Sequence, residues 1–166
     1  MKIPVALKRI LIGLLALIAL TATVIAIETL GGQPMGLFSG SRPDGLGFND
    51  GRFKQPSWKP NCVSSTVGKS DAHYIEPIAF SGAADAAWSK LAALVKSQPR
   101  VTAVGEKPNY LYAEFKSATM GYVDDVEFAM DGKANVIHVR SASRLGVRDF
   151  NVNRNRIESL RTAFAR

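Results

Sequence analysis

Charged side chains alternate with apolar ones in three stretches of the chain between residues 110 and 144. In each stretch the charged residues recur at every second position, so on a β-strand they would share one face. Side chains on neighbouring strands lie close enough to form ion pairs, to bind a divalent cation or to hold a ligand. The residues of this predicted polar face are Glu114, Lys116, Asp125, Glu127, His138 and Arg140.

Ion pairing is the interpretation that we favour for this face. In a meander of three strands, Glu114 and Glu127 would flank Arg140, in a geometry that suits a bidentate contact with its guanidinium group. A metal site is disfavoured, because Arg140 and Lys116 would repel a cation and zinc sites usually use two or more histidines or cysteines. We therefore expect no metal and no cofactor, and we assign no catalytic residue. Recognition of a ligand or partner by the same face is the alternative.

A thiol mechanism is a second possibility, and it depends on Cys62. This is the single cysteine of the chain, so no intrachain disulfide can form. A histidine such as His73 can hold a nearby thiol as the reactive thiolate. A lone cysteine beside a valine is more often a small buried hydrophobic residue. We therefore expect a binding domain rather than an enzyme, and the alternative is an envelope hydrolase or thiol enzyme that uses Cys62 or the Glu114/Glu127 face.

The C-terminal part of the chain is basic. From Arg140 to the end there are seven arginines and only two acidic residues, Asp149 and Glu158, in a chain of formal net charge +7. A basic region beside the start of a predicted helix favours anions such as lipid headgroups or an acidic partner. The predicted anion-binding or partner-binding residues are Arg144, Arg148, Arg154 and Arg156.

The periodicity of the chain predicts the elements that would position these residues. Apolar residues at helical spacing indicate helices over residues 81–95 and 153–164. Alternating patterns indicate five strands, over residues 73–80, 100–104, 110–117, 124–130 and 136–141. This order favours an α+β fold, a small antiparallel sheet with two helices packed on one face. The polar face would then lie on the side without helices.

The N-terminal segment predicts a membrane anchor. Residues 10–27 carry no charge, and about 20 apolar residues are enough to span a bilayer. Basic residues precede this run and none follows closely, which places the N-terminus in the cytoplasm and the domain in the periplasm of a bacterium. Because such a domain is exported, nucleic acid is not an expected partner. A cleaved signal peptide is the alternative, but its apolar core is usually shorter, about 7–15 residues.

The region that follows contains seven glycines and four prolines between residues 31 and 60, which excludes a long helix or strand. Its aromatic residues, Phe38, Phe48, Phe53 and Trp58, suggest that parts of it lie against the domain or the membrane surface. Folded over the polar face, the arm would bury it. The expected segments are a cytoplasmic basic N-terminus (1–9), a transmembrane anchor (10–30), a Gly/Pro-rich arm or linker (31–60) and a periplasmic α+β domain (61–166).

Four ordered motifs carry a resemblance to a known family. They are Pro60-Asn-Cys-Val-Ser64, Tyr110-Leu-Tyr-Ala-Glu-Phe-Lys-Ser117, Gly121-Tyr-Val-Asp-Asp-Val-Glu-Phe128, and Val139-Arg-Ser-Ala-Ser-Arg144 with Gly146 and Val152-Asn-Arg154. Over roughly residues 58–165 the chain resembles the domain of unknown function 1499 family. The resemblance implies a small α+β domain, often behind an N-terminal membrane segment in bacteria. It implies no established activity, substrate or cofactor. Tyr112 stands where many relatives are expected to have histidine.

Together these features predict a single-pass protein of the bacterial inner membrane whose periplasmic domain acts by binding. The expected partner is an inner-membrane protein complex, in which the chain would be an accessory subunit, or anionic lipid headgroups. A role in envelope stress or assembly fits the same features.

Overall fold

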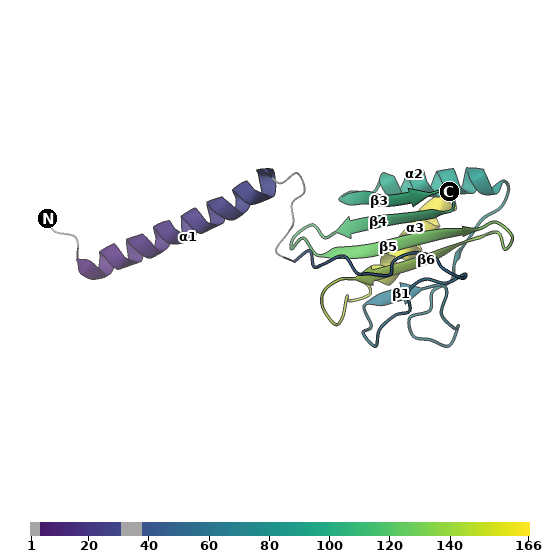
Figure 1. Cartoon of the computed structure of the whole chain (residues 1–166), viewed down its shortest axis with the longest axis horizontal. Coiled ribbons are helices and arrows are strands. Elements are labelled where there is room, and N and C mark those ends of the chain that lie inside the picture. The colour runs from purple at the N-terminus through teal and green to yellow at the C-terminus, as the bar shows by residue number, and fades with distance from the viewer. Residues whose placement is uncertain (1–3, 31–37) are drawn as a thin grey trace. The chain divides into compact units, whose positions relative to one another are not determined.

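The computed structural model describes residues 4–30 and 38–166, and the chain divides into two units, residues 1–36 and 37–166. The first unit contains helix α1, Val5–Leu30 (Figure 1). Its stretch Ala6–Thr23 has a mean hydropathy of 1.8, so within the described residues one helix is long and apolar enough to cross a membrane. The hydroxyls of Thr21 and Thr23 donate to helix carbonyls at 2.8 Å, which satisfies them without water.

The second unit is built on an antiparallel sheet with the strand order β1-β6-β5-β4-β3, and β2 also pairs with β6. The six strands are β1 Cys62–Ser64, β2 Ile78–Ala79, β3 Val101–Lys107, β4 Tyr110–Lys116, β5 Val123–Asp131 and β6 Val136–Ser143. The predicted α+β fold is therefore confirmed, and the three alternating stretches form β4, β5 and β6.

Two helices, α2 (Ala84–Lys96) and α3 (Val152–Phe164), pack on one face of this sheet. Leu111, Phe128 and Val139 are direct neighbours across β4, β5 and β6, and each is fully buried. Burying apolar side chains in this way is the main stabilising contribution to such a layer, about 1.5–3 kcal/mol for each large residue. The helices complete the core with Leu91, Val95, Ile157 and Leu160.

Two short strands differ from the expected elements. The predicted strand 73–80 contains only β2 and, at Tyr74, an isolated parallel bridge to Ser64. Pro77 directly precedes β2 and has no N–H to donate, which limits a longer ladder here. Strand β1 was not expected from the sequence, because three residues are too few to show an alternating pattern.

The described part of the Gly/Pro-rich arm, residues 38–60, belongs to the same compact unit as the sheet. Figure 1 shows this dark blue segment running across the sheet on the face without helices. Gly45 and Gly47 have φ angles of 72° and 135°, a backbone region that other residues rarely adopt. These glycines allow the irregular path by which the arm crosses the polar face.

Candidate functional site

The arm closes the face of the sheet on which sequence analysis placed the charged residues, and we call this the covered face. Its side chains come from β4, β5 and β6, at the positions that alternate with the core. Arg42 of the arm donates to Glu114 at 2.6 and 2.9 Å, and the backbone N–H of Gly47 donates to Glu127 at 2.7 Å. Phe48 stacks on His138, with ring centroids 5.6 Å apart. The arm thus folds over this face, as its aromatic residues indicated.

Glu127 and Arg140 form the centre of the covered face. Nη1 of Arg140 lies 3.1 Å from Oε2 of Glu127, and the two side chains are 7% and 0% exposed respectively. Tyr110 donates its hydroxyl to the other carboxylate oxygen of Glu127 at 2.7 Å, and Nε of Arg140 donates to the Lys54 carbonyl at 3.1 Å. The pair is therefore buried with its polar atoms satisfied, as buried charges require.

Glu114 does not flank Arg140, contrary to the sequence prediction. The register places Glu127 opposite Arg140, whereas Glu114 lies opposite Asp125, near the other end of the strands. The partner of Glu114 is instead Arg144, just beyond β6, at 2.5 Å. Arg140 makes one contact with a carboxylate oxygen rather than the bidentate contact that we expected.

Arg144 joins most of the remaining charges of this face. Its Nε lies 3.0 and 3.1 Å from the two carboxylate oxygens of Asp125, and its Nη2 also contacts Glu114 and the Tyr112 hydroxyl. Tyr112 in turn donates to Asp125 at 2.5 Å. Arg144 was predicted to bind an external anion, but its guanidinium is 6% exposed and is taken up by internal carboxylates.

The pKa shifts of these groups follow from burial and from their partners. Burial by itself raises the pKa of Glu114, but hydrogen bonds from Arg42 and Arg144 outweigh it and hold the pKa below its ordinary value. Burial lowers the pKa of Arg144, yet its bonds to Asp125 and Glu114 raise it overall. Burial also raises the pKa of Tyr112, so its hydroxyl stays neutral and donates to Asp125.

His138 and Lys116 lie on the same side of the sheet as the other predicted residues. Nδ1 of His138 is 3.2 Å from the Ser65 hydroxyl, and burial under the arm lowers the pKa of its imidazole. Lys116 is the last residue of β4, directly opposite Val123 at the start of β5. His138 is thus packed with an aromatic ring and a serine rather than with the carboxylates.

A second polar cluster lies between the sheet and helix α3, and Asn153 is its centre. This fully buried amide accepts from Ser141 at 2.6 Å and donates to the Asn61 carbonyl at 3.0 Å. Arg156 reaches the same amide oxygen at 2.7 Å and pairs with Asp124 at 2.5 Å. The cluster thus joins the segment before β1, the end of β6 and the start of α3.

The four arginines predicted to bind an anion do not form one site. Arg144 and Arg156 contact the internal carboxylates just described. Arg154 donates to the backbone carbonyls of Ala72 and Tyr74, at 3.3 and 2.8 Å. Arg148 is exposed on the loop between β6 and α3. The positive charge of the C-terminal region is therefore used mostly inside the fold.

Cys62 and His73 line the same hollow, of about 270 Å³, but they are not arranged as a reactive pair. The Cys62 thiol is buried and lies 3.6 Å from the Val63 carbonyl, and burial raises its pKa to about 11. Both ring nitrogens of His73 have other partners, the carboxylate of Asp71 at 2.8 Å and the carbonyl of Lys59 at 3.0 Å. Burial outweighs the opposing charge of Arg140, so this geometry does not favour the reactive thiolate.

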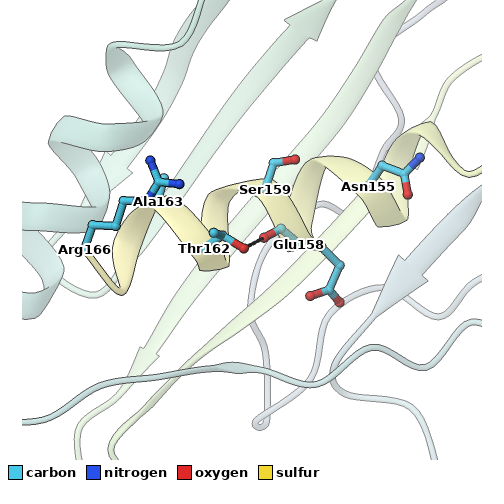
Figure 2. Close-up of a pocket in the computed structure, with 6 residues that line it drawn as sticks. All are labelled: Asn155, Glu158, Ser159, Thr162, Ala163 and Arg166. Carbon is cyan, nitrogen blue, oxygen red and sulfur yellow. Dashed lines mark hydrogen bonds between the residues drawn. The ribbon is translucent and has the colours of Figure 1, made fainter.

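A larger hollow, about 500 Å³, lies along the outer side of α3 (Figure 2). The hydroxyl of Thr162 donates to the Glu158 carbonyl at 3.0 Å, and the Glu158 carboxylate accepts from Arg161 at 2.9 Å. Its lining comes from this helix and the C-terminal residue alone, so no second element supplies converging groups: Asn155, Glu158, Ser159, Thr162, Ala163 and Arg166.

The domain also exposes large hydrophobic side chains, mostly at one end of the sheet. β4 ends, β5 begins, β6 ends and β1 begins at this end. We call the set the apolar end, and its members are Phe38, Trp58, Met120, Tyr122, Leu145, Val147, Phe150 and Val152. Sequence analysis singled out two of them, Phe38 and Trp58, as arm aromatics that lie against the domain or the membrane surface, but it did not identify the group as a site. For the others, apolar residues within turn-like segments are the signal that was available.

In the described segments 4–30 and 38–166, no three His, Cys, Asp or Glu side chains are grouped so as to hold a metal ion.

No curated protein and no solved structure matches the chain. The family described as protein of unknown function (DUF1499) matches residues 53–164, which is more than half of the chain. The four motifs and this match agree, and the chain belongs to the DUF1499 family.

Proposed function

We propose that this protein is a single-pass membrane-anchored binding module, an accessory subunit of a membrane complex, and not a catalyst. Helix α1 would span the bacterial inner membrane with the N-terminus in the cytoplasm, because Lys2, Lys8 and Arg9 precede the uncharged run of residues 10–27. The domain would then lie in the periplasm. Alkaline phosphatase fused after Arg166 checks this orientation, since that enzyme is active only outside the cytoplasm.

The observation that carries this proposal is the contrast between satisfied charges and exposed apolar side chains. Every buried side-chain nitrogen or oxygen in the described part of the chain has a hydrogen-bond partner. The carboxylates and guanidinium groups of the covered face are therefore occupied by one another and by the arm. By contrast, Trp58 and Phe150 are 78% and 89% exposed. Exposed apolar groups of this kind mark contact surfaces.

Affinity purification tests the accessory-subunit role. The tagged full-length protein is extracted from its native membrane in mild detergent and compared with a variant that lacks the anchor, residues 1–30. We expect stoichiometric membrane proteins with the unchanged chain and their loss with the variant. Recovery of the unchanged chain alone, as a free monomer on native gels under every condition, would contradict the proposal.

Thiol labelling tests the alternative of a thiol enzyme. Because Cys62 is buried and burial raises its pKa to about 11, an aromatic disulfide reagent should react with it only after denaturation. The matched control is Cys62→Ala, which should show no labelling in either state. Prompt labelling of the folded protein at neutral pH would favour the enzyme alternative over the binding module.

A further inference from the structure

Exposed large hydrophobic residues are concentrated at the apolar end of the domain. Of the nine large hydrophobic residues exposed in residues 38–166, eight belong to it, and the ninth, Val104, lies on the edge strand β3. Figure 1 shows the loop between β4 and β5 at the same end of the sheet as the loop that follows β6. Single exposed hydrophobic residues are ordinary, but a grouped set indicates an interaction site.

Contacts between separate segments hold this end together. The rings of Phe38 and Tyr122 lie 5.2 Å apart, which joins the arm to the loop between β4 and β5. The amide of Asn61 donates to the Gly146 carbonyl at 3.0 Å, which ties the segment of Trp58 to the loop after β6. A bond from the Arg144 N–H to the Val123 carbonyl at 3.2 Å also joins the loop after β6 to the start of β5. Seven of the eight residues therefore project from loops that are fixed to one another, and Val152 is the first residue of α3.

Phe150 shows that the exposure is built into the loop. Its φ angle is 52°, in the left-handed region that bulky residues rarely adopt, and Asn151 follows with φ 67°. Asp149 fixes this turn, because its carboxylate accepts from the backbone N–H groups of Asn151 at 3.2 Å and Asn153 at 2.8 Å. The strained backbone thus holds Phe150 in a position where the residue is 89% exposed.

The charges around these rings are positive. Arg148 is exposed beside Phe150, and Lys59 follows Trp58. The acidic residue of the loop, Asp149, is directed inward, where it also accepts from the Asn153 side chain at 2.9 Å. A surface of aromatic and aliphatic side chains with basic neighbours matches the interfacial region of a bilayer that contains anionic lipids.

We propose that the apolar end docks into the headgroup region of an anionic bilayer, with Trp58 and Phe150 as the inserting side chains. The inference deepens the proposed function and rests on α1 lying in a membrane. The chain enters the domain at this same end, through Phe38. Only residues 31–37 separate Phe38 from the end of α1, and the eight residue-to-residue steps from Leu30 to Phe38 span at most about 29 Å. The bilayer is thus the surface of matching chemistry within reach.

Tryptophan quenching by lipid tests this docking on the full-length protein. The chain has two tryptophans, so Trp88→Phe leaves Trp58 as the one reporter. The protein is reconstituted in vesicles of phosphatidylglycerol and phosphatidylcholine whose acyl chains carry bromine, a contact quencher. We expect most Trp58 emission to be lost relative to unbrominated vesicles, and less to be lost when phosphatidylglycerol is omitted.

Trp58→Phe is the matched control, because it leaves only Trp88 as reporter. Trp88 lies on α2 one turn after Ala84, which is close to Gly132 in the loop between β5 and β6, at the other end of the sheet. Its emission should be the same with brominated and unbrominated lipid. Circular dichroism of each variant establishes that the fold is retained.

Loop variants made in the Trp88→Phe protein, whose reporter is Trp58, separate the apolar and basic contributions to lipid docking. Phe150→Gly suits the positive φ and should reduce the quenching, and Arg148→Glu should reduce it only in vesicles with phosphatidylglycerol. Lys133→Glu, an equal charge change in the loop at the other end, should leave it unchanged.

Two results would overturn the docking. One is Trp58 emission that brominated lipid does not quench in a folded protein. The other is a blue shift without quenching, which would place a protein partner or a second copy on this end. Failure of the accessory-subunit role is distinguishable, because it appears as recovery of the chain alone in the purification, whatever the quenching shows.

Discussion

The covered face and the apolar end are two regions of one small domain that differ in the burial of their characteristic side chains. On the covered face, Glu127 and Arg140 are almost completely buried and contact each other, the arm and Tyr110. At the apolar end, Trp58 and Phe150 are mostly exposed to solvent. The region richest in charge in the sequence is closed, and the region open to partners is apolar.

The contrast teaches that dense charge in a sequence does not by itself mark a functional site. A buried ion pair stabilises little relative to a well-packed apolar pair, but it is costly to break, so it makes one arrangement of the arm much better than others. Exposed aromatic side chains contribute nothing to the core that they do not contact. Their position has to be explained by something outside the domain.

The largest effect is expected when one member of the buried pair is removed. Glu127→Ala leaves the Arg140 charge without its carboxylate and takes an acceptor from Tyr110 and from the Gly47 N–H. The free energy of unfolding should fall by roughly 3–5 kcal/mol, measured by chemical denaturation.

An exposed ion pair is the control for that experiment. Lys69 and Glu76 lie 3.5 Å apart with side chains 80% and 62% exposed, so Lys69→Ala should cost about 0–1 kcal/mol. If Glu127→Ala cost no more than Lys69→Ala, the covered face would not be the closed structural region described above.

A smaller loss is expected from the second polar cluster. Asn153→Ala removes an uncharged amide and leaves the Ser141 hydroxyl without this acceptor, while the Asn61 carbonyl keeps the N–H of Ser143. An unsatisfied buried polar group costs about 1–3 kcal/mol, so thermal denaturation should show a loss between those of Glu127→Ala and Lys69→Ala. Asn155→Ala, on the exposed side of the same helix, is the control and should be close to neutral.

Much of the fold could be predicted because its main elements are long enough to show a period. The alternation in β4, β5 and β6 also identified the core row of Leu111, Phe128 and Val139. Strand β1 was beyond this reasoning, and β2 was predicted only as part of a longer strand over residues 73–80, since two or three residues carry no period. Their place is set by pairing with β6, which is a tertiary interaction.

The charged residues could be placed on one face from the sequence, but their partners could not. Alternation fixes which side of the sheet a residue occupies, whereas pairing also depends on register. Because the register places Glu114 opposite Asp125, Glu114 forms its ion pairs with Arg144 and with Arg42 of the arm. Composition predicted that the arm is irregular, and only the fold shows which of its residues reaches which carboxylate.

Acid should weaken the covered face through Glu114. Its folded-state pKa is below the ordinary value of 4.5, so its contribution to stability is fully present above about pH 4.5 and is lost as the pH falls through the folded pKa. Denaturation between pH 7 and pH 3 should show a steeper decline for the unchanged protein than for Glu114→Gln. Equal slopes would mean that Arg42 and Arg144 do not hold this carboxylate in solution.

The smallest effect is expected at the apolar end, where the comparison is sharpest. Phe150→Gly removes a side chain that is 89% exposed and places glycine at a φ angle of 52° that suits it. Relief of a left-handed conformation, worth about 1–2 kcal/mol, is partly offset by the greater freedom of glycine in the unfolded chain, about 0.4–1 kcal/mol. Stability should therefore stay the same or rise slightly in a denaturation experiment, while membrane contact falls. A large loss of stability would show that Phe150 supports the fold, and the difference between the two regions would disappear.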